Sequence, residues 1–348
     1  MKLVQKGIVV LMILLIGGFA FAAGQSDTAG GDVSGDTIKK ATYSWTAGGM
    51  GGGWYTTAGG MAALINRVEP NITIKVVPGG GMENPLKLAA KQFEFGWGVS
   101  FIDKAAYNGS APLFDKAFNN IYGLAGNFSV DYHHYLAATS TGVTTFDDFI
   151  KKIKNGEKVK IAVPMAGTSG NTILGLVLAY YGTSFDDIKA AGGKVTNAVY
   201  GDMVNLFKDR HVDYVFAALG LPAAAITEMT ISRDATLMAM SDDVITHMAD
   251  EVGTVGLDSG VSFVPAGTYK GIDKDIQQIG HSTEICASED LPEIVAYTFV
   301  KTLMENIGEV QDLSASYKKY FSKANAPKTT IPLHPGAERY YREVGLIN

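Results

Sequence analysis

The chain has 348 residues, of which 47% are hydrophobic and 18% charged, and its formal net charge is −6. This composition is ordinary for packed globular domains, and the length corresponds to about two of them. The acidic balance and the absence of basic clusters argue against nucleic-acid binding, and a single cysteine excludes an internal disulfide framework.

The first 22 residues have the pattern of a cleavable export signal. Lys2 and Lys6 precede an apolar run at 8–19, and Ala20-Phe21-Ala22 fits cleavage after residue 22. The run is shorter than the roughly 20 residues that span a bilayer, which argues against the alternative of a membrane anchor. Cys286 is too distant to carry a lipid at the cleavage site. We therefore expect a periplasmic protein without a lipid anchor, whose net charge becomes −8 when two lysines are removed.

From residue 38 onward one pattern occurs twice, after a small, polar stretch at 23–37 that is typical of a flexible leader. The pattern is strand, Gly-rich turn, helix, strand, short helix, strand. The third strand begins 51 residues after the first in one copy and 52 in the other. The predicted strands are 42–46, 72–77 and 93–99, then 160–163, 194–200 and 212–217; the predicted helices are 57–68 and 83–91, then 172–181 and 203–209. The repeat predicts two similar α/β lobes with a ligand cleft between them, because open α/β sheets bind ligands at the carboxyl ends of their strands.

The remaining segments connect and complete these lobes. An alternating run at 132–136 is predicted as a strand near the lobe boundary, and Thr145 as the cap of a helix at 146–153. A strand at 261–264 is predicted to cross back to the first lobe. Further elements are expected at 222–229 (helix), 236–240 (strand), 242–251 (helix), 276–287 and 292–307 (helix). The predicted boundaries are 38–135 with 265–348 for the first lobe and 136–264 for the second.

The Gly-rich turn at 48–55 is the strongest local signal. It lacks the glycine register of a dinucleotide-binding fingerprint and the lysine of a P-loop. Its glycines allow the backbone to approach a ligand closely, with Trp54 or Tyr55 as one wall of the site. The alternative interpretation is a plain tight turn with aromatic core residues.

The second turn offers hydroxyl and backbone N–H groups from Gly167, Thr168 and Ser169 at the start of a helix. A simple helix cap would have the same appearance. A nucleophile elbow requires a glycine where Asn171 stands, so no catalytic serine is predicted.

The sequence gives no support for a metal, a cofactor or an enzyme. His133 and His134 are adjacent and would point to opposite faces of a strand, and the other four histidines lie apart without metal-binding spacing. The adjacent aspartate pairs stand at helix starts, where capping explains them. No arginine lies in a predicted cleft loop, so a carboxylate ligand would be held by helix N-termini, hydroxyls and amides.

Several motifs, taken in order, resemble the TAXI solute receptors of TRAP (tripartite ATP-independent periplasmic) transporters. They cover nearly all of the chain after residue 38. The motifs are the turn at 48–55, Gly79-Gly80-Gly81-Met82-Glu83-Asn84, Ala106-Tyr107-Asn108-Gly109, the loop at Gly167, Gly220-Leu221-Pro222, Val264-Pro265-Ala266-Gly267-Thr268-Tyr269 and Pro332-Leu333-His334-Pro335-Gly336-Ala337-Glu338.

The resemblance implies a two-lobed periplasmic binding protein (type II-like), a monomer, with two α/β domains joined by a hinge. It would deliver a small carboxylate or amino-acid-like ligand, most simply a glutamate-like one, to a TRAP membrane permease. Met50, Val99 and Phe101 stand where the family has polar residues, which implies a more apolar pocket. The implied ligand contacts are Gly51, Gly52, Trp54, Tyr55, Asn84, Ser100, Gly167, Thr168, Ser169 and Gly220. The alternatives are a binding protein of an ATP-driven importer and a secreted hydrolase.

Overall fold

The computed structural model describes residues 37–348, which form one compact unit. The predicted export signal at 1–22 and the predicted leader, apart from Thr37, lie outside these residues. Within residues 37–348 no helix combines the length and the apolar composition that crossing a bilayer would require.

Nine strands form one mixed sheet with the order β2-β1-β3-β11-β4-β7-β5-β6, and β8 pairs with β4. β1, β2 and β3 are parallel at one end, and β5, β6 and β7 are parallel at the other. Antiparallel β11 and β4 lie between these groups. The strands are β1 (Ala41–Thr46), β2 (Ile72–Val77), β3 (Phe95–Val99), β4 (Ile121–Ala138), β5 (Lys160–Val163), β6 (Lys194–Asn197), β7 (Tyr214–Gly220), β8 (Ala235–Leu237) and β11 (Gly280–Ser288).

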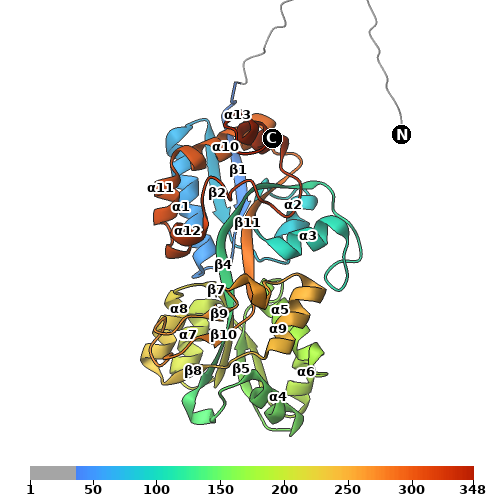
Figure 1. The fold of residues 1–348 in the computed structure, drawn as a ribbon, viewed down its shortest axis with the longest axis vertical. Helices are drawn as coiled ribbons and strands as arrows, with labels where there is room; N and C mark the ends of the chain where they lie inside the picture. Colours follow the sequence, from blue (N-terminus) through green and yellow to red (C-terminus); the bar gives the residue numbers. More distant parts are fainter. Residues whose placement is uncertain (1–36) are drawn as a thin grey trace, which may run out of the picture. The chain divides into compact units, whose positions relative to one another are not determined.

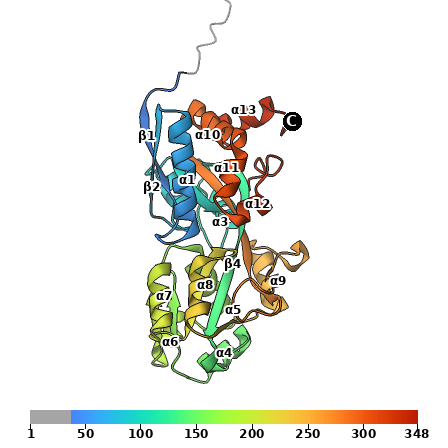
Figure 2. The ribbon, with the colours of Figure 1, turned by 90° about the vertical axis from the view of Figure 1, so that its left-hand side faces the viewer.

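Helices pack on both faces of each parallel group (Figure 1). We call β1, β2 and β3 with their helices lobe 1, and β5, β6 and β7 with theirs lobe 2; Figure 2 shows them from the side. Lobe 1 has α1 (Gly53–Val68), α2 (Asn84–Ala89), α3 (Ser100–Asn108), α10 (Glu293–Glu305), α11 (Ile307–Asp312), α12 (Ala315–Tyr320) and α13 (Pro335–Glu343). Lobe 2 has α4 (Phe146–Lys154), α5 (Ser169–Tyr180), α6 (Phe185–Ala190), α7 (Tyr200–Lys208), α8 (Ala224–Ser232) and α9 (Asp242–Val252). Two one-turn 3₁₀ helices, Thr139–Thr141 and Leu257–Ser259, lie in loops.

The 18-residue strand β4 connects the lobes. It pairs with β11 between Ile121 and Tyr132 and with β7 between Asp131 and Ala137. The run at 132–136 is a strand as predicted, but every residue in it is buried. A strand covered on both faces has no polar face, so the expected alternation of burial does not appear.

The predicted repeat is confirmed in the type and order of its elements. β2 and β5 have the predicted bounds, while α1 begins at Gly53, inside the Gly-rich turn. Thr145 caps α4, because its hydroxyl accepts the backbone N–H of Asp148 at 3.1 Å. The helices α3, α6, α11, α12 and α13 were not predicted. The residue boundaries given above for the lobes stay a prediction.

The prediction that a strand at 261–264 returns to the first lobe is wrong. β9 (Phe263–Val264) pairs with β10 (Ile276–Gln277) in a separate two-stranded sheet. Val264 is fully buried in the core of lobe 2, beside residues of β7 and α8. The return is made by β11, which pairs with both β3 and β4.

Candidate ligand-binding site

A cavity of about 310 Å³ lies between lobe 1 and lobe 2. Lobe 1 lines it with the Gly-rich turn, the loop at 78–83 and the segment at 314–317, and lobe 2 with 164–169, 198–200 and 218–220. β4 contributes Ser129 and Asp131. A cavity of this size has room for one small molecule.

Three helices of nine or more residues begin at the cavity wall, besides the six-residue helices α2 and α12. Gly52, Thr168 and Val199 are the N-caps of α1, α5 and α7, and all three line the cavity. Only Thr168 caps with its side chain, by accepting the N–H of Asn171 at 3.3 Å. Free N–H groups and the positive end of a helix dipole attract anions and polar oxygens, so these ends can hold a ligand carboxylate.

The structure brings five of the ten predicted contact residues to the cavity wall. These are Gly52, Trp54, Thr168, Ser169 and Gly220. The other five do not line it: Gly51, Tyr55, Asn84, Ser100 and Gly167. Of the three apolar replacements noted in the sequence, Met50 is on the wall, whereas Val99 and Phe101 are buried away from it.

Asn84 is fully buried, and its amide is satisfied by protein groups. Its oxygen accepts the backbone N–H of Gly80 at 3.1 Å and the Thr46 hydroxyl at 2.8 Å. Its nitrogen donates to the carbonyls of Ala47 at 2.8 Å and Trp97 at 2.7 Å. Asn84 therefore fastens the loop that carries Gly80 to the ends of β1 and β3.

The lobes touch each other beside the cavity through glycine-rich backbone. The N–H of Met82 donates to the carbonyl of Gly167 at 3.1 Å. A Cβ atom on Gly80 would lie 2.5 Å from that same carbonyl oxygen, and one on Gly52 would lie 3.4 Å from the Tyr200 ring. The glycines are needed here because they let one lobe approach the other.

Asp131 is a cavity residue that the sequence reasoning missed. It is 5% exposed, and its Oδ1 accepts the Ser129 hydroxyl at 2.8 Å. Burial raises the pKa of Asp131 to about 6, while the hydrogen bond from Ser129 and the nearby Trp54 indole N–H, which has no hydrogen-bond partner of its own, act to lower it. A charged residue within a long apolar strand was the available signal, since such a residue is rarely buried without a partner.

No lysine, arginine or histidine between residues 37 and 348 lines the cavity. Its acidic residues are Asp131 and Glu83, and Glu83 forms an ion pair with Lys87 at 2.6 Å.

The histidines are closer together than the sequence suggested. His281 was expected to lie apart, but its Nδ1 is 3.1 Å from Nε2 of His133, across the β4–β11 pairing. His134 instead contacts the Tyr269 hydroxyl at 2.8 Å, on the other side of β4. Burial lowers the pKa of His281 to about 3 and also lowers the pKa of His133, so the pair is neutral at pH 7.

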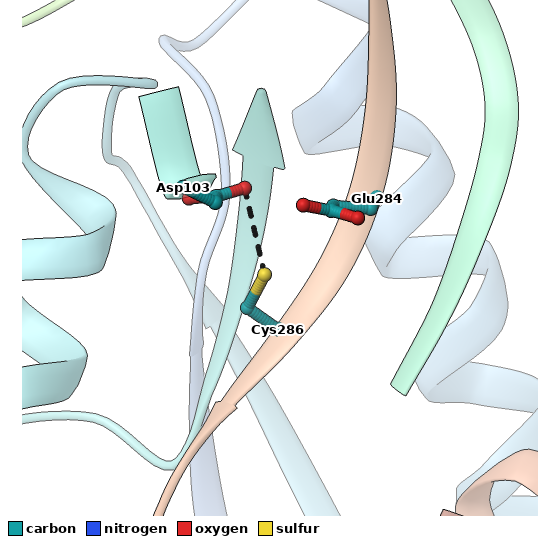
Figure 3. A group of neighbouring side chains, drawn as sticks. All are labelled: Asp103, Glu284 and Cys286. Carbon is teal, nitrogen blue, oxygen red and sulfur yellow. Dashed lines mark hydrogen bonds between the residues drawn. The ribbon is translucent and has the colours of Figure 1, made fainter. Parts of the chain in front are cut away.

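A second group of ionisable side chains, the acidic cluster, lies inside lobe 1 (Figure 3). It consists of Asp103, Glu284 and Cys286, whose ligand atoms lie within 4.8 Å of one another. The Cys286 thiol donates to Oδ2 of Asp103 at 3.5 Å. Burial raises the pKa of Asp103, and it raises the pKa of Glu284 to about 7. The sequence did not predict this grouping, and its expectation of no metal site stays a prediction.

Comparison with known proteins places these features in a family. The sequence matches the NMT1-like family over residues 45–345. The periplasmic binding protein BugD is similar in structure, with a TM-score of 0.52 and 12% identity over 88% of this chain and 98% of that one. MatC from Rhodopseudomonas palustris with bound malate has a TM-score of 0.50 and 11% identity over 88% of this chain and 97% of that one. These likenesses concern the fold alone, and they confirm the predicted α/β, two-lobed periplasmic binding protein fold.

Proposed function

The chain belongs to the NMT1-like family, and on this premise we propose that it is an extracytoplasmic solute-binding protein that delivers a small ligand to a membrane permease. The observation that carries the proposal is the cavity between the lobes, whose wall is built by both of them. A ligand that contacts both lobes stabilises the form in which they are close together, so ligand binding shifts the population toward that form.

The ligand we propose is a small carboxylate or amino-acid-like molecule, with a glutamate-like compound as the first candidate. The helix N-termini of α1, α5 and α7 support a carboxylate group. Malate, which is bound in the MatC structure, is a small carboxylate held by the same kind of fold. The volume of about 310 Å³ favours a compact ligand over a peptide or an oligosaccharide.

The residues that we propose as direct contacts are Gly52, Trp54, Thr168, Ser169 and Gly220. Asn84 acts through the loop that it fastens, and Tyr55 acts through packing in lobe 1. Trp54→Ala should weaken ligand binding by about 1 kcal/mol or more, because an aromatic wall is lost. Tyr55→Ala is the matched control, and an equal loss of affinity in both variants would contradict the assignment of Trp54.

The decisive experiment is a ligand screen on purified protein that has been unfolded and refolded to remove any ligand carried through purification. Small carboxylates and amino acids are tested by thermal shift, and each hit is measured by calorimetry. Binding of a compound with one-to-one stoichiometry supports the proposal, because a ligand that binds only the folded state raises the melting temperature. A protein that binds none of these compounds is not the proposed receptor.

The partner we propose is the permease of a TRAP transporter of the TAXI type, with the protein acting as a periplasmic monomer. The motif order carries this part of the proposal, and a binding protein of an ATP-driven importer is the competing assignment. Transport in vesicles that contain the permease separates the two. Uptake driven by an ion gradient without ATP supports the TRAP assignment, and uptake that depends on ATP contradicts it.

A further inference from the structure

One carboxyl oxygen in the cavity wall has no partner. β4 carries Asp131 at the position where it pairs with His281 on β11 and with Gly220 on β7. Its Oδ1 accepts the Ser129 hydroxyl at 2.8 Å. Among residues 37–348, none forms a hydrogen bond to its Oδ2; the Trp54 indole N–H lies near the carboxyl, and it too has no partner within hydrogen-bond geometry. A nearly buried carboxylate with an open oxygen is unfavourable unless a donor meets it.

The charges and aromatic rings of the wall favour a cationic donor for the open oxygen of Asp131. Glu83 has Lys87 as its counter-ion, whereas Asp131 has no cationic neighbour on the wall. The aromatic side chains of Trp54, Tyr200 and Tyr317 line the same cavity, and aromatic rings attract cations. The hydroxyls of Tyr200 and Tyr317 are already used, since they donate to the Ala218 carbonyl at 3.0 Å and to Thr57 at 2.8 Å. These hydroxyls therefore do not donate to Asp131, and its open oxygen is left for the ligand.

The helix N-termini at the wall have the opposite preference, because they favour an anion. α1, α5 and α7 begin at the wall and direct free N–H groups there. The cavity thus combines groups that favour an anion with one buried carboxylate that favours a cation. A molecule that carries both charges satisfies both features.

We propose that the ligand is a small amino acid or a related zwitterion, whose protonated amine binds the open oxygen of Asp131 while its carboxylate is held at the helix N-termini. This inference rests on the proposed function and narrows its ligand class. A carboxylic acid without an amine would bring no donor to Asp131 and would add a second negative charge beside it. Amine recognition, more than carboxylate recognition, then decides which acids bind.

The test uses matched pairs of probes that differ only in the amine. Calorimetry compares amino acids with their deaminated counterparts, such as glutamate with glutarate and norvaline with pentanoate, and includes malate as a dicarboxylate. The expected result is that the amino compounds that bind do so at least tenfold more tightly than their counterparts. Equal or tighter binding of the deaminated acids overturns this inference and leaves the solute-binding function standing. If no probe binds, both the proposed function and this inference are overturned.

The variant Asp131→Asn provides a second, independent measurement. It keeps the volume of the side chain and removes its charge, so affinity for the amino compounds should fall at least tenfold. The melting temperature of the ligand-free variant should not fall, because a buried charge has been removed. Unchanged affinity in a folded Asp131→Asn protein overturns the inference.

Discussion

Two places in residues 37–348 bury carboxyl groups, and they differ in what surrounds the acid. Asp131 lies in the wall of the cavity between the lobes, with one oxygen bound to Ser129 and the other open. In the acidic cluster, Glu284 is fully buried and both of its oxygens accept from Thr330, from the backbone N–H at 2.9 Å and from the hydroxyl at 2.5 Å. Asp131 thus has one open oxygen beside a space that a ligand can fill, whereas each oxygen of Glu284 accepts a hydrogen bond from Thr330.

This difference shows that burial of an acidic side chain does not by itself mark a binding site. Burial raises the pKa of Asp131, Asp103 and Glu284 alike. What separates them is access, because Oδ1 of Asp103 also lacks a hydrogen-bond partner, but Asp103 and Glu284 do not line the cavity and Asp131 does. If this distinction is correct, mutations in the acidic cluster should change stability, and mutations in the cavity should change ligand binding.

The largest effect is expected from Glu284→Ala. The substitution leaves the backbone N–H of Thr330 without its acceptor and opens a void in the core of lobe 1, while the Thr330 hydroxyl keeps the Ser100 carbonyl as an acceptor at 2.6 Å. We expect the free energy of unfolding at pH 7 to fall by roughly 3 kcal/mol, measured by urea denaturation without ligand. Glu284→Gln is the matched control, because it keeps the volume and one acceptor, and it should lose less than half as much.

Urea denaturation of Asp131→Ala tests whether the cavity acid and the cluster acid differ in their contribution to stability. Its loss of stability should stay within about 1 kcal/mol, since removal of an incompletely paired buried charge offsets the lost contact with Ser129. If Asp131→Ala were as destabilising as Glu284→Ala, the two acids would have the same structural role, and the distinction would be wrong.

The next effect concerns the contact between the lobes. A methyl group on Gly80 would lie 2.5 Å from the Gly167 carbonyl oxygen and 3.3 Å from the Cα of Thr168, both in lobe 2. Gly80 does not have a positive φ, so alanine fits its own loop. Gly80→Ala should therefore weaken ligand binding at least tenfold in calorimetry, with little change in ligand-free stability.

The control for this variant is Gly59→Ala, in the exposed part of α1, where an added Cβ contacts nothing within 4 Å. It should leave affinity unchanged. A Gly80→Ala protein that binds as tightly as the original chain would show that the lobes need not approach as closely as they do here.

Much of this fold was predictable from the sequence, because the repeat of strand, Gly-rich turn and helix is a local pattern. Apolar runs predicted the bounds of two strands, Ile72–Val77 and Lys160–Val163. The preference of threonine for helix caps predicted the role of Thr145. The return strand was misassigned because β9 is an apolar run, whereas β11 carries several polar residues and does not look like a buried strand. Which of them joins the large sheet depends on pairing with distant strands, which no local pattern records.

The site was predictable only where a motif marks it. The Gly-rich turns and the loop at Thr168 and Ser169 signalled the wall through composition. Asp131 lies in β4, whose sequence is typical of a buried core strand. Ser316 and Tyr317 line the cavity from a segment that is distant in the sequence and has no recognisable motif. Asn84 was predicted as a contact because its motif is conspicuous, yet its hydrogen bonds hold the loop behind the wall.

A smaller effect is expected from pH, which should change ligand affinity through the protonation of Asp131. Burial raises the pKa of Asp131 to about 6, so the carboxyl is ionised above that pH and becomes protonated below it. A protonated carboxyl no longer attracts an ammonium group. The affinity for an amino-acid ligand should thus be constant above pH 7 and fall about tenfold between pH 7 and pH 5, measured by calorimetry.

The neighbouring groups do not obscure this profile. His281 faces Asp131 from β11 with a pKa lowered to about 3, and the pKa of His133 is also lowered. The phenols of Tyr200 and Tyr317 have pKa values raised above their usual range. His281 and the two phenols do not change charge between pH 5 and pH 7, and burial favours the neutral form of His133. An affinity that does not change over this interval would show that Asp131 does not bind the ammonium group of the ligand.

The smallest effect is expected from metal ions at the acidic cluster. A structural zinc site has four ligands, and the cluster supplies three acidic or thiol groups, of which Glu284 already accepts two hydrogen bonds. Zinc would have to displace protons from groups whose pKa values burial raises, including that of the Cys286 thiol. Zinc chloride or EDTA should therefore change the melting temperature by less than about 1 °C in the original chain and in Cys286→Ser alike. A zinc-dependent rise that Cys286→Ser abolishes would make the cluster a metal centre, and access would then no longer explain why one buried acid binds a ligand and the other does not.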